Sequence, residues 1–284
     1  MMDFMKGRSG ELSLGALFVS GLSGFILAYQ YDPGQPFVST IYIETLLPFG
    51  SFFRSLHFWS SQAFFLLLLW HVYCSYGKSA DLKRRRLGDT GPAFDLKWLV
   101  LSTTIFLALY ALFSGYCLRY DRTGRDAAQI AEHLFLSIPL AGELVDRLLL
   151  SLRHDGLNRV YAVHILFTFI LWLMGTWYHL KRTILRSDVL LGSLLAGCLL
   201  ALLLKAPLDP KDMSLDMVKG PWFFLGVQEL LRHAPPFQAG ILFPLVPLMA
   251  IAGMSHAKIR KKCLIILGSW TILYFLLTIT LILR

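Results

Sequence analysis

The chain has little cysteine. Only four of its 284 residues are Cys, and no two of them form a Cys-x-x-Cys pair. This scarcity argues against a disulfide framework, a zinc site, an iron–sulfur cluster and a thioether-linked haem with a Cys-x-x-Cys-His motif. We expect the cysteines to be small apolar packing residues: they are Cys74, Cys117, Cys198 and Cys263.

The chain also has few charged residues, and acids are fewer than bases. Charged residues make up 16% and hydrophobic residues 56%, with a mean hydropathy of +0.58, which is the composition of an integral membrane protein. A net charge of +9 would suit nucleic-acid binding. However, Lys and Arg cluster in short segments between apolar runs, as topology signals do. We therefore expect contact with membrane lipid and no nucleic acid.

Seven apolar runs are long enough to cross a bilayer, which takes about 20 residues. They are about 12–30, 56–76, 97–118, 160–180, 188–204, 239–255 and 263–283, the fifth being short. We predict an all-α integral membrane protein with a four-helix bundle over 1–186 and a three-helix part over 187–284. Two long connections, 119–159 and 205–238, are expected to be functional. In the first, Asp126–Leu136 and Glu143–Leu152 are predicted as interfacial helices separated by Ile138-Pro139.

Basic residues mark alternate connections between these runs. All four groups fall on one side of the membrane if the N-terminus is cytoplasmic, which satisfies the positive-inside rule. We expect this orientation in a bacterial inner membrane, and no cleavable signal peptide, because the first apolar run is too long for one. The four groups are Lys6 and Arg8; Lys78, Lys83, Arg84, Arg85, Arg86 and Lys97; Lys181, Arg182 and Arg186; and Lys258, Arg260, Lys261 and Lys262.

Four histidines lie inside two of the apolar runs at matched intervals. His57 and His71 are fourteen positions apart, and His164 and His179 are fifteen apart. Each interval puts both imidazoles near one helix face, roughly 21–22 Å apart along the axis. A single intramembrane histidine is more often a packing residue than a ligand. Two matched pairs on parallel helices instead predict two stacked haems, each with two axial histidines, because haem iron accepts axial imidazole.

Small residues and one arginine fit this interpretation. Gly10 and Gly24 repeat the interval of fourteen in the first run, and Gly115 lies in the third; glycines give the room that a haem requires, although ordinary close helix packing also uses them. Arg54 lies one turn before His57. Its guanidinium is predicted to pair with a haem propionate or to extend to the membrane interface.

These residues resemble the cytochrome b subunit of quinol-oxidising bc-type complexes. The histidine spacing is similar to the plastid-type branch, and four helices followed by three resemble that branch's two subunits fused in one chain. The matching stretches are Arg54–His57 and Leu69–Val72 for the family's second helix, Ser114–Tyr116 with Asp121 for the end of its third, Ile138–Gly142 for the hairpin beside its outer quinol site, and Leu157–His164 for the start of its fourth.

The chain departs from the family where the resemblance places quinol oxidation. Pro221, Trp222 and Phe223 occupy the position of the family's Pro-Glu-Trp-Tyr motif, so the Glu that accepts a proton from quinol is replaced by proline. Glu229, about two turns downstream, is the predicted substitute, with a solvated interfacial carboxylate as the alternative. By resemblance, Asp121 and Tyr120 are the other candidate catalytic residues, and Ile138 and Gly142 line the quinol site. The plastid type's extra-haem cysteine would fall near Arg8, so an extra haem would lack a thioether link.

The resemblance implies a membrane quinol oxidoreductase with two haems b. Quinol would be oxidised near the outer surface, with one electron leaving for a Rieske-type iron–sulfur protein and a c-type cytochrome in other chains. The other electron would cross the haems to an inner quinone site, in a dimeric complex. One alternative is a haem b anchor that shuttles electrons between the quinone pool and a peripheral enzyme. Another is a secondary transporter with intramembrane histidines and no haem.

Overall fold

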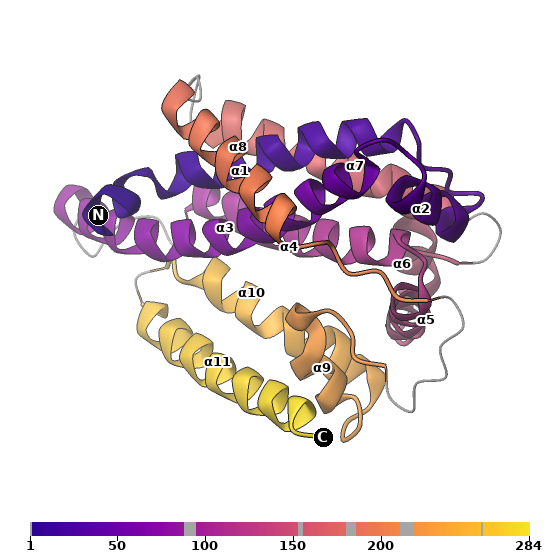
Figure 1. Ribbon diagram of the computed structural model, residues 1–284. Coiled ribbons are helices and arrows are strands. Elements are labelled where there is room, and N and C mark those ends of the chain that lie inside the picture. The colour runs from indigo at the N-terminus through magenta and orange to yellow at the C-terminus, as the bar shows by residue number, and fades with distance from the viewer. Residues whose placement is uncertain (1, 88–94, 153–155, 180–185, 211–217, 257) are drawn as a thin grey trace. The chain divides into compact units, whose positions relative to one another are not determined.

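The computed structural model describes residues 2–87, 95–152, 156–179, 186–210, 218–256 and 258–284, without the side chains of 2–7, 77–87, 178 and 179. Helices make up 80% of the structure, and the described residues contain no strand, which confirms the all-α prediction. The helices are α1 (Met2–Ala28), α2 (Pro36–Thr45), α3 (Gly50–Leu87), α4 (Leu96–Leu118), α5 (Arg122–Leu136), α6 (Gly142–Leu149), α7 (Gly156–Leu173), α8 (Ser187–Leu203), α9 (Leu225–Leu230), α10 (Phe243–Gly253) and α11 (Arg260–Ile282) (Figure 1).

Four described helices are long and apolar enough to cross a membrane. They are Arg8–Ala28 in α1, Leu96–Leu118, Gly156–Trp177 and Arg260–Ile282, and they match the first, third, fourth and seventh predicted spans. The second predicted span lies within α3. The fifth and sixth correspond to shorter apolar helices, Ser187–Leu203 and Phe237–Gly253. A seven-span topology therefore stays a prediction, as does the domain boundary near residue 186.

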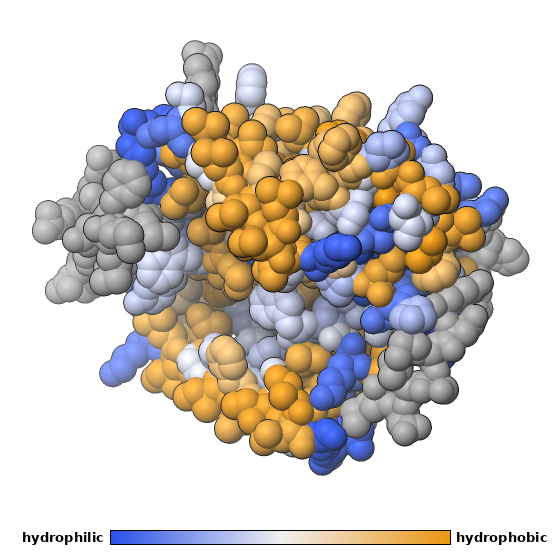
Figure 2. Space-filling view, in the orientation of Figure 1, coloured by the Kyte–Doolittle hydropathy of each residue, from blue (hydrophilic) through white to orange (hydrophobic). Residues whose placement is uncertain are grey.

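Apolar side chains are exposed along α8 and α11. In α11, leucines, isoleucines and Phe275 are exposed along most of the length, and α8 exposes six leucines; Figure 2 shows the apolar surface over α11 in the lower part of the view. A helix that is hydrophobic all round is typical of a membrane span, where lipid takes the place of water. The surface therefore agrees with an integral membrane protein.

One compact unit is built around α1. It comprises Met1–Gly91, Leu107–Leu112 and Ile165–Leu208, and in it α1 packs along α3 and α8 (Figure 1). Val19, Leu56 and Ala201 form a buried apolar cluster from these three helices. Arg8 of α1 and Asp188 of α8 form an ion pair of 3.0 Å. This unit carries His57 and His71 on α3.

The second compact unit holds connection 119–159 up to residue 152 and from residue 156, and most of connection 205–238, both of which were predicted to be functional. It comprises Pro92–Phe106, Phe113–His164 and Asp209–Arg284, and in it α11 packs against α9 and α10. The Trp98 indole of α4 donates to the Ile251 carbonyl of α10 over 2.7 Å. Helices are present at both predicted positions, as α5 and α6, with the break at the Ile138-Pro139 turn; their location at the membrane interface stays a prediction. This unit carries His164 and every residue predicted for the quinol site.

Candidate functional site

His57 lies on α3 against the last turns of α1. Its Nδ1 is 2.8 Å from the carbonyl oxygen of Ser20, and since a carbonyl only accepts, Nδ1 carries the proton and donates. In the neutral ring this leaves the lone pair on Nε2. A Cβ placed on Gly24 would lie 2.8 Å from His57 Cε1. Gly24, which was predicted to give a haem room, therefore faces His57.

His71 repeats this arrangement four turns further along α3. Its Nδ1 lies 3.0 Å from the hydroxyl of Ser9, and the hydroxyl of Ser75, one turn on, lies 3.4 Å from both ring nitrogens. A Cβ on Gly10 would lie 2.9 Å from His71 Cε1. The interval of fourteen in α1 thus faces the interval of fourteen in α3.

His164 belongs to the other unit and has equivalent surroundings. Its Nδ1 lies 2.9 Å from the hydroxyl of Ser114, and a Cβ on Gly115 would lie 3.1 Å from its Cε1. His179 is the last residue of η2 (Met174–His179), a π-helical turn that follows α7; its side chain lies outside the described residues. Single π turns of this kind are frequent at functional sites.

The three described imidazoles share two features that suit axial haem ligands. Each meets a glycine that keeps one side of the ring clear of any side chain, and each has an oxygen partner at Nδ1, which orients the ring. For His57 the partner is a carbonyl, which also fixes the tautomer. Sequence reasoning found the glycines but missed the Nδ1 partners. A recurring Ser-Gly pair, Ser9-Gly10 and Ser114-Gly115, was the available signal. These residues therefore fit haem b.

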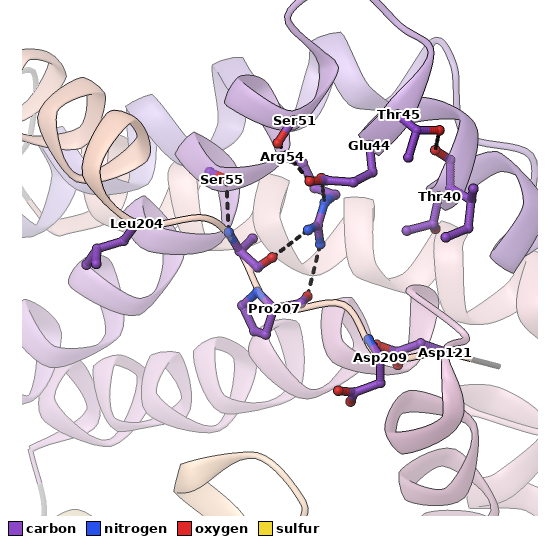
Figure 3. Close-up of polar contacts among 12 residues, drawn as sticks. Thr40, Glu44, Thr45, Ser51, Arg54, Ser55, Asp121, Leu204, Pro207 and Asp209 are labelled. Carbon is purple, nitrogen blue, oxygen red and sulfur yellow. Dashed lines mark hydrogen bonds and ion pairs between the residues drawn. The ribbon is translucent and has the colours of Figure 1, made fainter. Parts of the chain in front are cut away.

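Arg54 holds a segment of its own unit in place (Figure 3). Its Nε donates to the Glu44 carboxylate, and its two terminal nitrogens donate to the carbonyls of Ala206 and Pro207. The Ala206 N–H donates to the hydroxyl of Ser55 over 2.9 Å. The side chain is only 8% exposed. These contacts differ from the predicted alternatives, and propionate pairing by Arg54 stays a prediction.

Asp121 organises the corner between α4 and α5. It is fully buried, forms an ion pair of 3.2 Å with Arg119, and caps α5 by accepting from the Gly124 N–H. Its second oxygen accepts from the Asp209 N–H over 3.0 Å, shown in Figure 3. Tyr120 has a φ of 51°, a left-handed conformation that costs a non-glycine residue energy and turns the chain into this corner.

The segment in the place of the family motif packs against α4 and α11. Pro221 and Phe223 are buried, whereas Trp222 is half-exposed. The Phe224 ring meets the Phe113 ring edge-on at 5.2 Å, and the hydroxyl of Tyr274 donates to the Phe223 carbonyl over 2.7 Å. Residues 113–115 of α4 therefore contact this aromatic segment and the His164 imidazole within one turn.

The remaining predicted quinol-site residues belong to the α5–α6 turn. The Gly142 N–H donates to the Ile138 carbonyl over 3.0 Å. A Cβ on Gly142 would lie 2.8 Å from the carbonyl oxygens of Phe135 and Leu136, so a side chain there would force the turn open. Ile138 and Gly142 therefore form part of the turn itself. Their part in binding quinol stays a prediction.

Glu229 is a fully buried carboxylate with basic neighbours. Its Oε1 lies 3.2 Å from His233 Nε2 and 3.2 Å from Arg284 Nη1. Its Oε2 lies 3.9 Å from Arg232 Nε and has no hydrogen-bond partner among the described residues. The burial differs from the solvated interfacial carboxylate that was the alternative prediction. Sequence reasoning missed His233, although the Glu–His spacing of four was a signal for a contact on one helix face.

Comparison with known proteins agrees with this arrangement. A family model described as "Cytochrome b/b6/petB" matches residues 8–184. Cytochrome b6 of Synechococcus sp. (strain WH7803) is 27% identical over 191 residues, which are 65% of this chain and 82% of that protein. Cytochrome b6 of Prochlorococcus marinus (strain NATL1A) is 26% identical over 191 residues, again 65% and 82%.

A solved structure supports the fold over nearly the whole chain. It is described as "Hyperthermophilic respiratory Complex III", and it matches with a TM-score of 0.61 and 18% identity over 96% of this chain and 84% of that one. At this identity the likeness concerns the fold alone. The family model, however, spans more than half of the sequence and covers all four predicted haem ligands. The chain therefore belongs to the cytochrome b/b6 family.

Proposed function

We propose that this chain is the di-haem membrane subunit of a bc-type quinol oxidoreductase. Family membership implies haem b. His57 with His164 would hold one haem and His71 with His179 the other. Bound there, the haems supply one-electron transfer across the membrane. The protein's part is to orient the ligands, bind quinol and handle its protons.

The observation that carries this proposal is the threefold repeat of imidazole, glycine and Nδ1 partner. A packing histidine needs no glycine opposite its Cε1 and no oxygen partner held at Nδ1. Both features are what an axial ligand requires, since the iron-facing nitrogen must be unprotonated and the ring must keep its angle. The repeat occurs for His57, His71 and His164, which lie in two different units of the chain.

Quinol would be oxidised beside the 113–115 turn of α4. The aromatic rings of Phe113 and Phe224 offer an apolar surface for a quinol ring. The neighbouring Ser114 contacts His164, so the site lies beside the proposed outer ligand. Asp121 has both oxygens engaged in structural contacts, which favours a positioning role for it. Glu229 then remains as the proton acceptor.

The partners of the proposed subunit follow from the electron balance. Quinol gives up two electrons. The proposed arrangement would send one to an iron–sulfur protein of Rieske type and then to a c-type cytochrome. The other would go to an inner quinone by way of the haems that the four histidines would hold. The complex is proposed as dimeric, in a bacterial inner membrane with the N-terminus cytoplasmic, as the basic groups predict.

Haem quantitation with reduced-minus-oxidised spectroscopy tests the ligand assignment. The purified wild-type complex should contain two haems b per chain, and His57→Ala and His71→Ala should each lose one. His133→Ala is the matched control, because His133 is an exposed histidine of α5 whose Nδ1 contacts the Gln129 carbonyl of its own helix. Unchanged haem content in both ligand variants would refute the assignment.

A second function has one observation in its favour. Pro221 stands where the family's motif has a glutamate, so the chain could be a haem b anchor that passes electrons between a quinone and a peripheral enzyme. Subunit identification separates the two: an iron–sulfur protein of Rieske type in the purified complex, seen by electron paramagnetic resonance, supports quinol oxidation by the proposed route. A peripheral dehydrogenase or reductase in its place supports the anchor.

A further inference from the structure

A buried carboxylate that accepts protons requires a route to water. Glu229 is 0% exposed, so water does not reach it directly. A proton taken up there leaves through a side chain in contact with it. The described contacts of its carboxylate are with three basic side chains: Arg232, His233 and Arg284.

Only one of these three side chains can release a proton at physiological pH. The guanidiniums of Arg232 and Arg284 stay protonated throughout that range, so they hold the carboxylate in place but do not carry protons. An imidazole gains and loses a proton near neutral pH. The His233 side chain is also 57% exposed while its Nε2 lies 3.2 Å from Glu229 Oε1. It therefore joins the buried carboxylate to solvent.

We propose that His233 is the proton relay between Glu229 and bulk water during quinol oxidation. This inference rests on the proposed function. A quinol hydroxyl gives its proton to Glu229, and the carboxyl passes a proton to His233 Nε2 and returns to the carboxylate. The imidazolium then releases its Nδ1 proton to water, and exchange with water restores the starting tautomer. The electrons leave separately to the iron–sulfur and haem acceptors, so only a proton travels through this pair.

The ion pairs around Glu229 suit such a relay. Arg284 and His233 both lie on Oε1, whereas Oε2 has no hydrogen-bond partner among the described residues. One carboxylate oxygen is thus anchored by neighbours, and the other makes no hydrogen bond to the described residues and can accept a proton. The carboxyl rotates about its last carbon–carbon bond between receiving the proton and passing it on.

The test is quinol oxidation by the purified complex, measured with a short-chain quinol from pH 6 to pH 9. His233→Ala should lower the rate about 10²–10⁴-fold at pH 7, the range found for general acid–base groups, and added imidazole should restore much of it by occupying the space. In the variant the rate should keep rising with pH, because hydroxide replaces the lost base. Among the described residues, the other charged groups that face Glu229 are Arg232 and Arg284. His133→Ala is the matched control, and haem content should be unchanged in both.

Each result decides the proposal. A wild-type complex that does not oxidise quinol overturns the proposed function and the relay with it. If the wild type is active and Glu229→Gln is slow, but His233→Ala behaves like His133→Ala, the relay is wrong while quinol oxidation stands. A slow His233→Ala variant with the wild-type pH profile and no imidazole rescue shows a merely structural role and also overturns the relay. An active Glu229→Gln variant also overturns the relay, because the relay requires a carboxylate at this position.

Discussion

The contact between Gly24 and His57 gives a sharp prediction for haem binding. A methyl group on Gly24 would lie 2.8 Å from His57 Cε1. Ordinary carbon–carbon contacts are about 3.5–4.0 Å, so Gly24→Ala creates an overlap of roughly 1 Å. Overpacking of this kind costs about 1–3 kcal/mol. Because the clash falls on a proposed ligand, we expect the affinity of the outer site for haem to fall about 5–150-fold.

Gly21 provides the matched control in the same helix. A Cβ there would meet no atom within 4 Å, and Gly21→Ala gains the same helix propensity of about 1 kcal/mol as Gly24→Ala. The difference between the two variants therefore isolates the contact with His57. Gly115→Ala, with a distance of 3.1 Å to His164 Cε1, should have an intermediate effect, because the ring needs to give by only a few tenths of an ångström.

The assay is haem b per chain after purification, together with the rate at which haem is lost to excess apomyoglobin. Gly24→Ala should lose the outer haem fastest, Gly115→Ala should be intermediate, and Gly21→Ala should match the wild type. Equal haem content and equal loss rates for Gly24→Ala and Gly21→Ala would show that this glycine is ordinary helix packing, which was the alternative reading of the sequence.

Two further substitutions test the supports of the proposed quinol site. Asp121→Ala should lower the free energy of unfolding by about 3–5 kcal/mol, since it leaves the buried Arg119 without its ion pair. The control Asp126→Ala breaks a partly exposed pair and should lower it by about 1 kcal/mol or less. Equal shifts of the thermal unfolding midpoint in the two variants would contradict this prediction. Tyr274→Phe removes the hydrogen bond to the Phe223 carbonyl, worth about 0.5–1.5 kcal/mol, and should raise the KM for quinol more than it lowers kcat. The exposed Tyr29→Phe change should alter neither, and an unchanged KM in Tyr274→Phe would rule out this positioning role.

The helices and the haem-ligand pattern were largely predictable from the sequence. Apolar runs and the interval of fourteen depend on helix periodicity, which is local information. The limits of α3 were harder to predict. The helix extends from Gly50 to Leu87, well beyond the predicted span of 56–76. The residues that follow the span, such as Ala80, Leu82 and Arg84, are mostly good helix formers, although the segment is too polar to lie in lipid.

The contacts of the charged residues could not be predicted, because their partners are distant in sequence. Arg54 meets carbonyls about 150 positions away, and Arg284 meets Glu229 across 55 positions of chain. Hydropathy and charge patterns say that such residues need partners without saying which ones they find. The contact between Ser114 and His164 was easier to predict, because each glycine that faces a proposed ligand follows a serine in the sequence.

The stretch after α8 is tethered by its peptide groups. The Trp59 indole and the Arg54 guanidinium donate to carbonyls of residues 204, 206 and 207, and Ser55 accepts from the amide of residue 206. Hydrogen bonds to the main chain of this stretch do not depend on which side chains the stretch carries. Substitution of the outward-facing Leu204 and Pro207 should therefore leave the path of the main chain unchanged. A saturation scan should find that substitutions are tolerated poorly at Arg54, Ser55 and Trp59 of α3, whose side chains make these contacts.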